Sequence, residues 1–415
     1  MSSSIRLGDH CSKIGSGATP RGGKKSYLSS GPFALIRSQN INNHRFIKDG
    51  LVFISNEQAK DLRNAEVLPE DILLSITGYI KVCQVNNAIL PARVSQHVII
   101  IRPDRDIIAP KFLRYYLASP FMQSYMLSLA GAGGTRDALT KGMVEDFQIP
   151  NIPIQNQRNI ASTLSALDDK INLNRQMNET LESMARTLFK DWFVDFGPTR
   201  AKMKAREPYL AQEIWDLFPD KMDNEGKPKP EDWEYCPVGD FAGIRGGMQL
   251  EKKYISNEGP VPVFGGAGIM GYTTNHNAQG FVISFGRVGA YCGQFFSYRG
   301  NAWINNNASL VSPNSNVSGE WLLLALRYIN IDAIKRGAAQ PFVSNGDIIK
   351  EKILWSGDAL TNAFSDRIGN LMKKIEANNV ESTTLAQTRD LLLPKLVSGE
   401  LKISDAEKFI EKVGI

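Results

Sequence analysis

Two long stretches of the chain carry an apolar stripe whose members recur at alternating spacings of four and three residues. The first stretch runs from about Gln155 to Asp195 and the second from about Asp358 to Lys395. This heptad spacing keeps one side of a helix facing a partner helix. The seam positions are Leu164, Leu167, Ile171, Leu181 and Leu188 in the first stretch and Ile368, Leu371, Ile375, Leu385 and Leu392 in the second.

The two seams are related by a shift of 204 residues and are interrupted at the same two places. Asn174 and Asn178 interrupt the first seam, and Asn378 and Ser382 interrupt the second. Polar residues inside such a seam weaken it but fix its register. The simplest way to bury both apolar seams is to pack the two helices against each other.

The repeat extends beyond the helices. Leu7-Gly8-Asp9 recurs as Val238-Gly239-Asp240, and Gly142 recurs as Gly346. A repeat of roughly 200 residues indicates a duplicated domain, whereas solenoid repeats are shorter. The order predicted is therefore globular unit, long helix, globular unit, long helix.

Each globular part consists mostly of short apolar or alternating runs between Gly, Asn and Pro clusters, which predict strands. Short helices are expected at Pro110–Leu129 and Gly319–Tyr328. The runs are Phe33–Arg37, Val67–Ile76, Val94–Arg102, Val261–Phe264, Phe281–Phe285 and Ala308–Val311.

The predicted fold is α+β. Two β-rich domains are separated by two long antiparallel helices that form a coiled-coil spacer, and a pseudo-twofold duplication relates the halves. A stretch rich in Pro, Lys, Asp and Glu links the first helix to the second domain, with a helical turn or two at Gln212–Phe218. The expected boundaries are 1–153 for the first domain, 154–196 for the first helix, 197–235 for the connector, 236–356 for the second domain, and 357–415 for the second helix and tail.

Charge is distributed unevenly along the 415 residues, which are too many for a single core. Residues 1–150 carry 18 Lys and Arg against 12 Asp and Glu, and residues 236–357 carry 10 against 7. The two helix-containing segments are slightly acidic. The basic segments indicate a polyanionic partner, whereas the acidic helices are better suited to bind protein.

Four cysteines are scattered along the chain, so neither a disulfide framework nor a structural zinc site is predicted, and a reducing cytoplasm is expected. The first nine residues have no apolar core of the kind found in a signal peptide. Neither long helix has an apolar run that could span a membrane.

Two glycine-rich segments resemble cofactor loops but lack the required context. Gly266–Gly271 matches a dinucleotide fingerprint, yet Pro260 and Pro262 are expected to break the strand before it, and no helix follows. Gly22–Ser26 resembles a phosphate-binding loop with the wrong spacing. The chain contains no Pro-Pro dipeptide, so the motif that holds a flipped adenine in amino-methyltransferases is missing. We expect no catalytic site, cofactor or metal.

The loops of both globular parts are rich in side chains that contact DNA, since Arg and Lys suit guanine edges and phosphates, and Asn and Gln suit adenine edges. For any one of these residues a solvated loop is the better explanation, because most surface Lys and Asn side chains contact only water. As groups, the clusters favour DNA contact, since both parts repeat them. The first set is Thr19, Arg21, Lys24, Lys25, Arg37, Gln39, Asn40, Thr77, Tyr79, Lys81, Arg93, Gln96, Thr135 and Arg136. The second set is Gln249, Lys252, Lys253, Arg287, Asn305, Asn306 and Gln340.

Five stretches of the chain form specific motifs. They are Ala166-Leu167-Asp168-Asp169-Lys170-Ile171 with Leu173-Asn174, Leu188-Phe189-Lys190-Asp191-Trp192-Phe193, Thr388 through Leu396 with Ser398-Gly399-Glu400-Leu401, Gly17–Pro20, and Phe264-Gly265-Gly266 through Gly271-Tyr272. Together they resemble the specificity subunit of type I restriction–modification systems over nearly the whole chain. The resemblance implies two target-recognition domains, each reading one half of a split site in double-stranded DNA. It also implies two modification subunits that carry the methyl donor, and restriction subunits that cut.

On this interpretation the chain is a non-catalytic DNA reader and assembly scaffold. One alternative is a fragment or variant of a fused adenine methyltransferase–endonuclease. Another is a protein scaffold that binds no DNA. Methyl transfer by the chain alone would favour the first alternative, and the absence of salt-dependent DNA binding would favour the second.

Overall fold

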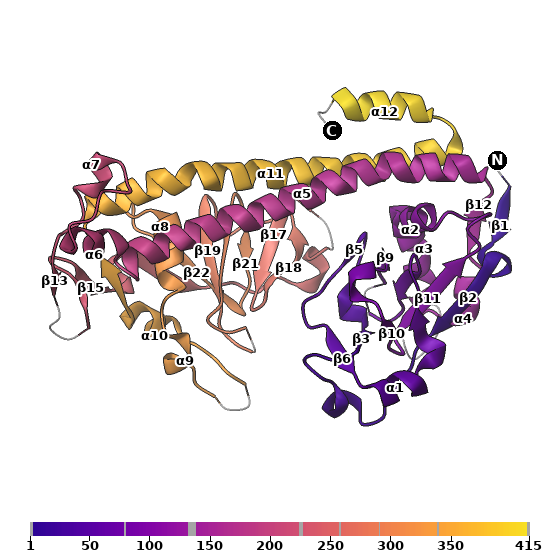
Figure 1. Cartoon of the computed structure of the whole chain (residues 1–415), viewed down its shortest axis with the longest axis horizontal. Coiled ribbons are helices and arrows are strands. Elements are labelled where there is room, and N and C mark those ends of the chain that lie inside the picture. The colour runs from indigo at the N-terminus through magenta and orange to yellow at the C-terminus, as the bar shows by residue number, and fades with distance from the viewer. Residues whose placement is uncertain are drawn as a thin grey trace. The chain divides into compact units, whose positions relative to one another are not determined.

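The computed structural model describes residues 3–78, 80–131, 138–223, 227–256, 259–289, 291–337 and 340–412. The chain divides into two compact units, which we call unit 1 (residues 1–174 and 380–415) and unit 2 (residues 175–379). Each unit contains one β-rich domain and a part of each long helix (Figure 1).

Unit 1 is built on two four-stranded sheets. The first is antiparallel throughout, and in the second the two central strands run parallel. Its buried strands are rich in Ile, Leu and Val, which suits pleated surfaces that are covered by other elements. In spatial order the first sheet is β2 (Cys11–Ser16), β11 (Val98–Pro103), β8 (Ile72–Ser75) and β9 (Val82–Gln84), and the second is β6 (Val52–Ile54), β3 (Phe33–Ile36), β10 (Ala92–Val94) and β7 (Glu66–Val67).

Unit 2 repeats this arrangement. Its antiparallel sheet has the same spatial order of strands, and its second sheet again contains a parallel pair, β17 with β21. The antiparallel sheet is β16 (Ala242–Gly246), β22 (Ala308–Pro313), β19 (Phe281–Gly286) and β20 (Phe295–Arg299), and the second sheet is β18 (Gly268–Thr273), β17 (Val261–Gly265) and β21 (Trp303–Ile304).

The smaller elements confirm that the chain is duplicated. The two short glycine-containing sequences found at residues 7–9 and 238–240 both form 3₁₀ turns, η1 and η6. Gly142 and Gly346 are the second residues of two short helices whose first turns are capped by the hydroxyls of Thr140 and Ser344. These elements are η1 (Leu7–His10), η6 (Val238–Asp240), α4 (Lys141–Glu145) and α10 (Asn345–Lys350), together with the strand pairs β1 (Ser4–Arg6) with β12 (Gln148–Pro150) and β15 (Glu234–Pro237) with β23 (Lys352–Trp355).

The short helices lie where the apolar pattern predicts them. The first predicted helix is two helices, because Pro120 begins a second one that continues to Gly131, and the second is one helix that ends at Leu326 and whose first turn is capped by Ser318. The remaining elements of the two domains are α1 (Asn56–Asp61), α2 (Pro110–Ala118), α3 (Pro120–Gly131), α8 (Gly319–Leu326), α9 (Ile331–Ile334), β4 (Ile41–Asn42), β5 (Arg45–Phe46), and the 3₁₀ turns η2 (Gly23–Ser26), η3 (Ser38–Asn40), η4 (Arg63–Ala65), η5 (Asn87–Ile89) and η7 (Lys252–Tyr254).

The two long stretches form the helices α5 (Ile154–Phe193) and α11 (Asp358–Ser398). Within unit 1 they run antiparallel, because Asp168 meets Arg389 and Asn174 meets Glu381. Within unit 2 they also run antiparallel, since Asn178 meets Asn378 near the unit boundary and Phe189 packs edge-on against Phe364 further along.

The seam positions lie on the packed side of the helix pair. Leu164, Leu167, Leu385 and Leu392 are buried in the core of unit 1, and Ile171 is half-buried against that core. In unit 2, Ile368 is buried and Leu181, Leu188, Leu371 and Ile375 are half-buried.

The polar interruptions of the two seams face each other. In unit 2 the amide of Asn378 donates to that of Asn178 over 2.8 Å, and in unit 1 the amide of Asn174 donates to the carboxylate of Glu381 over 2.7 Å. These hydrogen bonds satisfy polar groups that would otherwise be buried without partners.

The connector is more structured than its composition predicts. It contains α6 (Gly197–Met203), α7 (Gln212–Trp215), β13 (Met222–Asp223) and β14 (Lys229–Pro230), and its Phe218 and Trp233 join the aromatic core of unit 2. These aromatic residues are widely spaced along a polar segment and form no periodic pattern. The sequence around each of them therefore does not indicate that they are buried together. In unit 1 the tail forms α12 (Ile403–Lys412), whose Ala406 and Ile410 enter the core.

The expectation that Pro262 breaks a strand is wrong, whereas Pro260 lies just before the strand begins. Pro262 lies inside β17, opposite Tyr272 of β18. The pairing of β17 with β21 begins only at Val263, so the missing N–H of Pro262 faces no partner in β21. The glycine motif itself runs into a strand, since β18 begins at Gly268 and includes Gly271, and no helix of the kind that a dinucleotide fingerprint requires begins there.

Candidate nucleic-acid interface

In each unit, the loop that follows the first strand of the antiparallel sheet begins with a glycine that packs closely against the backbone of the second sheet's side of the domain. A Cβ atom on Gly17 would lie 1.7 Å from the carbonyl oxygen of Val94, and one on Gly247 would lie 2.1 Å from that of Asn305. Only glycine permits so close an approach of two backbones. The side chains beyond it are exposed in both units: Thr19, Arg21, Lys24 and Lys25 in unit 1, and Gln249, Lys252 and Lys253 in unit 2.

In unit 1, residues 37–50 form a loop held together by Asn40. Its side chain is fully buried, accepts from the backbone of Arg37, and donates to the carbonyl oxygens of Ile47 and Asp49. Asn40 therefore shapes the loop and is not free to contact a base. Gln39 on the same loop is exposed, and its amide nitrogen lies 3.3 Å from the carbonyl oxygen of Gly50.

Arg37 is half-buried at the base of this loop. Its guanidinium donates to the carbonyl oxygen of Gly50 and lies 5.4 Å from the centre of the Tyr27 ring. Both contacts hold the side chain against the protein, so we interpret Arg37 mainly as a support for the loop.

Two other cations of unit 1 are also occupied by the protein. Arg93 is 7% exposed, donates to the carbonyl oxygen of Ala59 and pairs with Glu66 over 3.2 Å. Lys81 donates to Asn42 over 3.0 Å, and burial lowers its pKa. These contacts argue against Arg93 and Lys81 as DNA contacts, because binding a phosphate would leave their internal partners unsatisfied.

The other members of the first set have different positions. Gln96 is exposed and contacts His97, whereas Thr77 is half-buried and bridges to Ala138. Tyr79, Thr135 and Arg136 lie outside the described residues.

In unit 2 four loops converge. Backbone hydrogen bonds join Arg287 to Asn307 and Val343, and a β-bridge joins Val288 to Phe342. The loop carrying Gln249 lies against the same surface, because the Asn306 amide contacts that of Gln249 at 3.3 Å.

Asn305 is the support of this surface. It is 6% exposed; its side-chain oxygen accepts from the backbone of Leu250, and its amide nitrogen lies 3.4 Å from the sulfur of Met270. We therefore assign it the same supporting role as Asn40 in unit 1. Asn306 and Gln340 are exposed and Arg287 is half-buried, while Lys253 pairs with Glu251 over 2.8 Å.

Sequence reasoning missed several exposed apolar side chains on these loops and on strand β18. They are Met248, Ile269, Met270, Val288, Tyr291 and Phe342. Residues 17–26, 37–50 and 94–97 of unit 1 expose no large apolar side chain, but Leu28, just beyond the first of these ranges, is 42% exposed. No local pattern distinguishes an exposed methionine from a buried one, so the sequence carried no signal for this difference.

A buried charged cluster in unit 1 was also missed. Asp168 of α5 accepts from Arg389 of α11 over 2.7 Å, from Arg114 over 3.0 Å and from the Tyr115 hydroxyl over 2.8 Å. Burial alone would raise the pKa of Asp168, but the guanidinium of Arg114 and its other cationic neighbours lower it on balance. Arg114 also donates to the backbone of His44, so the cluster connects the helix pair to the loop of residues 37–50.

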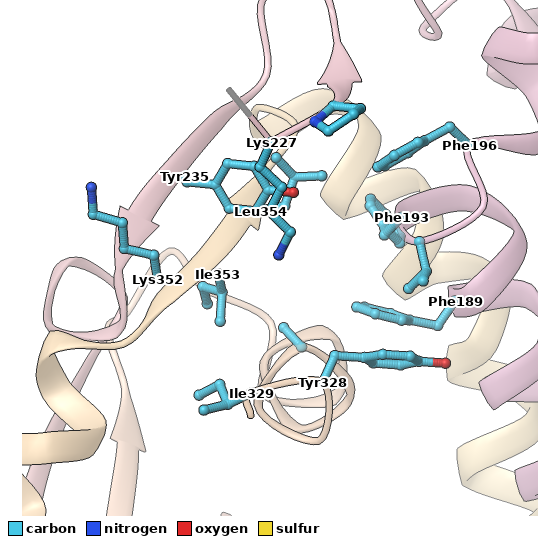
Figure 2. A pocket seen from close by; sticks show the side chains of 13 residues that line it. Phe189, Phe193, Phe196, Lys227, Tyr235, Tyr328, Ile329, Lys352, Ile353 and Leu354 are labelled. Carbon is cyan, nitrogen blue, oxygen red and sulfur yellow. The ribbon is translucent and has the colours of Figure 1, made fainter. Parts of the chain in front are cut away.

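Unit 2 contains a cavity of about 330 Å³ beside the end of α5. Figure 2 shows Phe189, Phe193 and Phe196 on one side of it, with Tyr235 and Lys352 opposite. Its walls are mainly aromatic and aliphatic, so it suits an apolar group better than a phosphate. The sequence motif at residues 188–193 supplies two of these rings.

Among the described residues, no group of three His, Cys, Asp or Glu side chains is placed to hold a metal ion. No described helix is long and apolar enough to cross a membrane.

The fold and its loops define a duplicated β-rich protein on a helix pair, with polar and cationic loops in equivalent places. Residues 3–183 and 230–354 match the family model of the type I restriction modification DNA specificity domain, and the chain belongs to this family. This confirms the resemblance carried by the sequence motifs.

Relatives match over most of the chain. The HindI specificity subunit of Haemophilus influenzae is 24% identical over 88% of this chain and 94% of its own length. The MjaIX specificity subunit of Methanocaldococcus jannaschii is 24% identical over 95% and 92%. A solved specificity subunit from M. genitalium covers 95% of each chain at 17% identity and a TM-score of 0.45, which is too low to support a structural conclusion.

Proposed function

We propose that the chain is the DNA-reading subunit of a type I restriction–modification complex and that each β-rich domain reads one part of a bipartite site. One observation carries the proposal: the same scaffold occurs twice and presents different polar side chains at equivalent places. A duplicated fold with divergent loops is what two readers of different sequences require, because loops can vary while the scaffold is kept.

The direct test of DNA reading is a binding titration with the full chain at several salt concentrations. Neutralising phosphates releases counterions, so the logarithm of the binding constant should fall linearly with the logarithm of salt concentration. A specific duplex should also be preferred over a scrambled one. Binding that is absent, or that does not respond to salt, would favour the protein-scaffold alternative.

We further propose that the chain performs no methyl transfer or cleavage itself. A buried carboxylate in unit 1, that of Asp168, already accepts hydrogen bonds from Arg389, Arg114 and Tyr115, so it is occupied by protein partners. The test is incorporation of labelled methyl groups into DNA by the purified chain. Incorporation by the chain alone would support the fused methyltransferase–endonuclease alternative.

Partner subunits would then supply the chemistry. We propose two modification subunits and, for cleavage, restriction subunits, with the slightly acidic helical segments offering protein surfaces. Two copies of the scaffold give a reason for two modification subunits, one for each β-rich domain. Measuring the mass of the complex after co-expression tests this: one modification subunit per chain at saturation would contradict the proposed stoichiometry.

A further inference from the structure

Two exposed methionines of unit 2 lie next to residues proposed to contact DNA. Met248 precedes Gln249 in the chain and is 55% exposed, and Met270 is 48% exposed and contacts the amide of Asn305, the residue before Asn306. Gln249 and Asn306, whose amides contact each other, are therefore each one residue away from a methionine or from a residue that contacts one.

The amide pair has a defined hydrogen-bonding capacity. The Asn306 amide nitrogen lies 3.3 Å from the Gln249 side-chain oxygen, so each amide uses one of its two polar atoms on the other. Whichever way the pair is oriented, the nitrogen of one amide and the oxygen of the other are not used in this hydrogen bond, so the pair still offers both N–H donors and acceptor sites. In the major groove adenine presents one acceptor, N7, and one donor, the N6 amino group. The pair is therefore complementary to the adenine edge.

The methionines could contact thymine, the base paired with that adenine. Thymine is the base that presents a methyl group in the major groove, and apolar side chains pack against it. An amide pair beside an exposed methionine thus provides for both partners of an A·T pair. The charge of the region fits a polyanion as well, because residues 236–357 carry more cationic than anionic side chains.

We propose that Gln249 and Asn306, together with Met270 or Met248, read an A·T base pair in the part of the DNA site that unit 2 recognises. The inference rests on the proposed DNA reading and goes further by naming the base pair and the residues.

The experiment combines altered bases with altered side chains. The site is first obtained by sequencing methylated DNA from cells that carry the chain and its modification partners. Duplexes are then made in which each thymine is replaced by deoxyuridine, which lacks the methyl group, or each adenine by 7-deazaadenine, which lacks N7. Binding is measured with the full chain in complex with its modification subunits.

One thymine-to-deoxyuridine change in the part of the site read by unit 2 should weaken wild-type binding about fourfold, the effect of roughly one buried methylene. The same change should have no effect on Met270→Ala or on Met248→Ala, whichever methionine makes the contact. Replacement of the paired adenine by 7-deazaadenine should weaken wild-type binding by at least about fivefold and leave Gln249→Ala unaffected. Met184→Ala, which alters an exposed methionine of α5, is the matched control and should behave as wild type.

Three results would overturn the inference. The first is a part-site for unit 2 that contains no A·T pair. The second is selective binding in which every deoxyuridine and 7-deazaadenine is tolerated. The third is that Met248→Ala and Met270→Ala bind DNA normally but fail to assemble with the modification subunits. That result would assign the two methionines to a protein-docking surface. Loss of all selectivity in the wild-type chain would instead refute the proposed function itself.

Discussion

At the scale of single residues, unit 1 places a neutral histidine inside a charged cluster. The Nδ1 atom of His44 lies 4.0 Å from the carboxylate of Asp168 and has no hydrogen-bond partner. Burial, and after it the guanidinium of Arg389, lowers the pKa of His44 to about 3, with Arg114 acting in the same direction and Asp168 opposing it. His44 also adopts a positive φ of 63° at the turn between β4 and β5.

This lowered pKa predicts a dependence of stability on pH. Below its ordinary pKa of 6.5 His44 takes up a proton in the unfolded chain but not in the folded one. The stabilisation is therefore complete above that value and is lost as pH falls towards 3. Between pH 7 and 5.5 the unfolding free energy should drop by about 1 kcal/mol more in wild type than in His44→Asn. Asparagine tolerates a positive φ, so the turn is kept. Urea unfolding at the two pH values measures this, and equal drops would contradict the assignment.

Arg93 and Arg21 allow a second comparison between a supporting cation and a contacting one. Arg93 is held by Glu66 and Ala59, whereas the side chain of Arg21 is 94% exposed. We expect Arg93→Ala to lower the unfolding free energy by about 1–3 kcal/mol, because the carbonyl oxygen of buried Ala59 loses its hydrogen bond. Arg21→Ala should change stability by less than about 0.5 kcal/mol but reduce the salt slope of DNA binding by about one. Thermal melts and salt titrations of both variants distinguish the two roles, and a reversed pattern would refute them.

At the scale of elements, the helix pair carries the clearest link between sequence and structure. In unit 1, Leu167 is fully buried in the core, while Leu173 on the same helix is 52% exposed. Asn174, which interrupts the apolar seam further along α5, donates a hydrogen bond to Glu381 of α11. The seam thus combines apolar burial, which stabilises, with specific hydrogen bonds, which set the register.

These two leucines provide a matched test of the seam. Leu167→Asp places a carboxylate in a packed core and should cost more than about 3 kcal/mol and prevent assembly with partner subunits. Leu173→Asp makes the same chemical change at an exposed position of the same helix and should cost less than about 1 kcal/mol. Unfolding curves for the two variants check this. Similar melting of both proteins would mean that the seam is assigned to the wrong helix face.

The sequence predicts a feature of the fold or of the candidate site only where the residues that form it lie close together in the chain. The helices and most strands were predictable, because their periodic patterns lie within a few residues of one another. The roles of Asn40, Arg93 and Asn305 were not, since each is buried by contacts with loops that are distant in sequence or folded back on themselves. The sequence does not distinguish a polar side chain that supports a loop from one that faces solvent. The loops of the candidate site were therefore predictable, but the role of each residue in them was not.

At the scale of the whole molecule, the account depends on two readers built from one duplicated scaffold. The strand order of the antiparallel sheet is the same in both units, and Gly17 and Gly247 place the following loop in the same way. The loops themselves differ: those of unit 1 carry exposed cations and amides, and those of unit 2 carry exposed cations, an amide pair and several exposed apolar side chains. Each unit should therefore determine its own part of the recognised sequence.

The most direct test is to sequence methylated DNA from cells that carry the chain with its modification partners, in wild type and in two sets of variants. One set changes Arg21, Lys24 and Gln39 to alanine, and the other changes Arg287, Asn306 and Gln340. The account predicts that each set relaxes or abolishes recognition of one part of a split site and leaves the base preference of the other part intact. A single variant set that alters both parts would contradict the claim that the two units read separately.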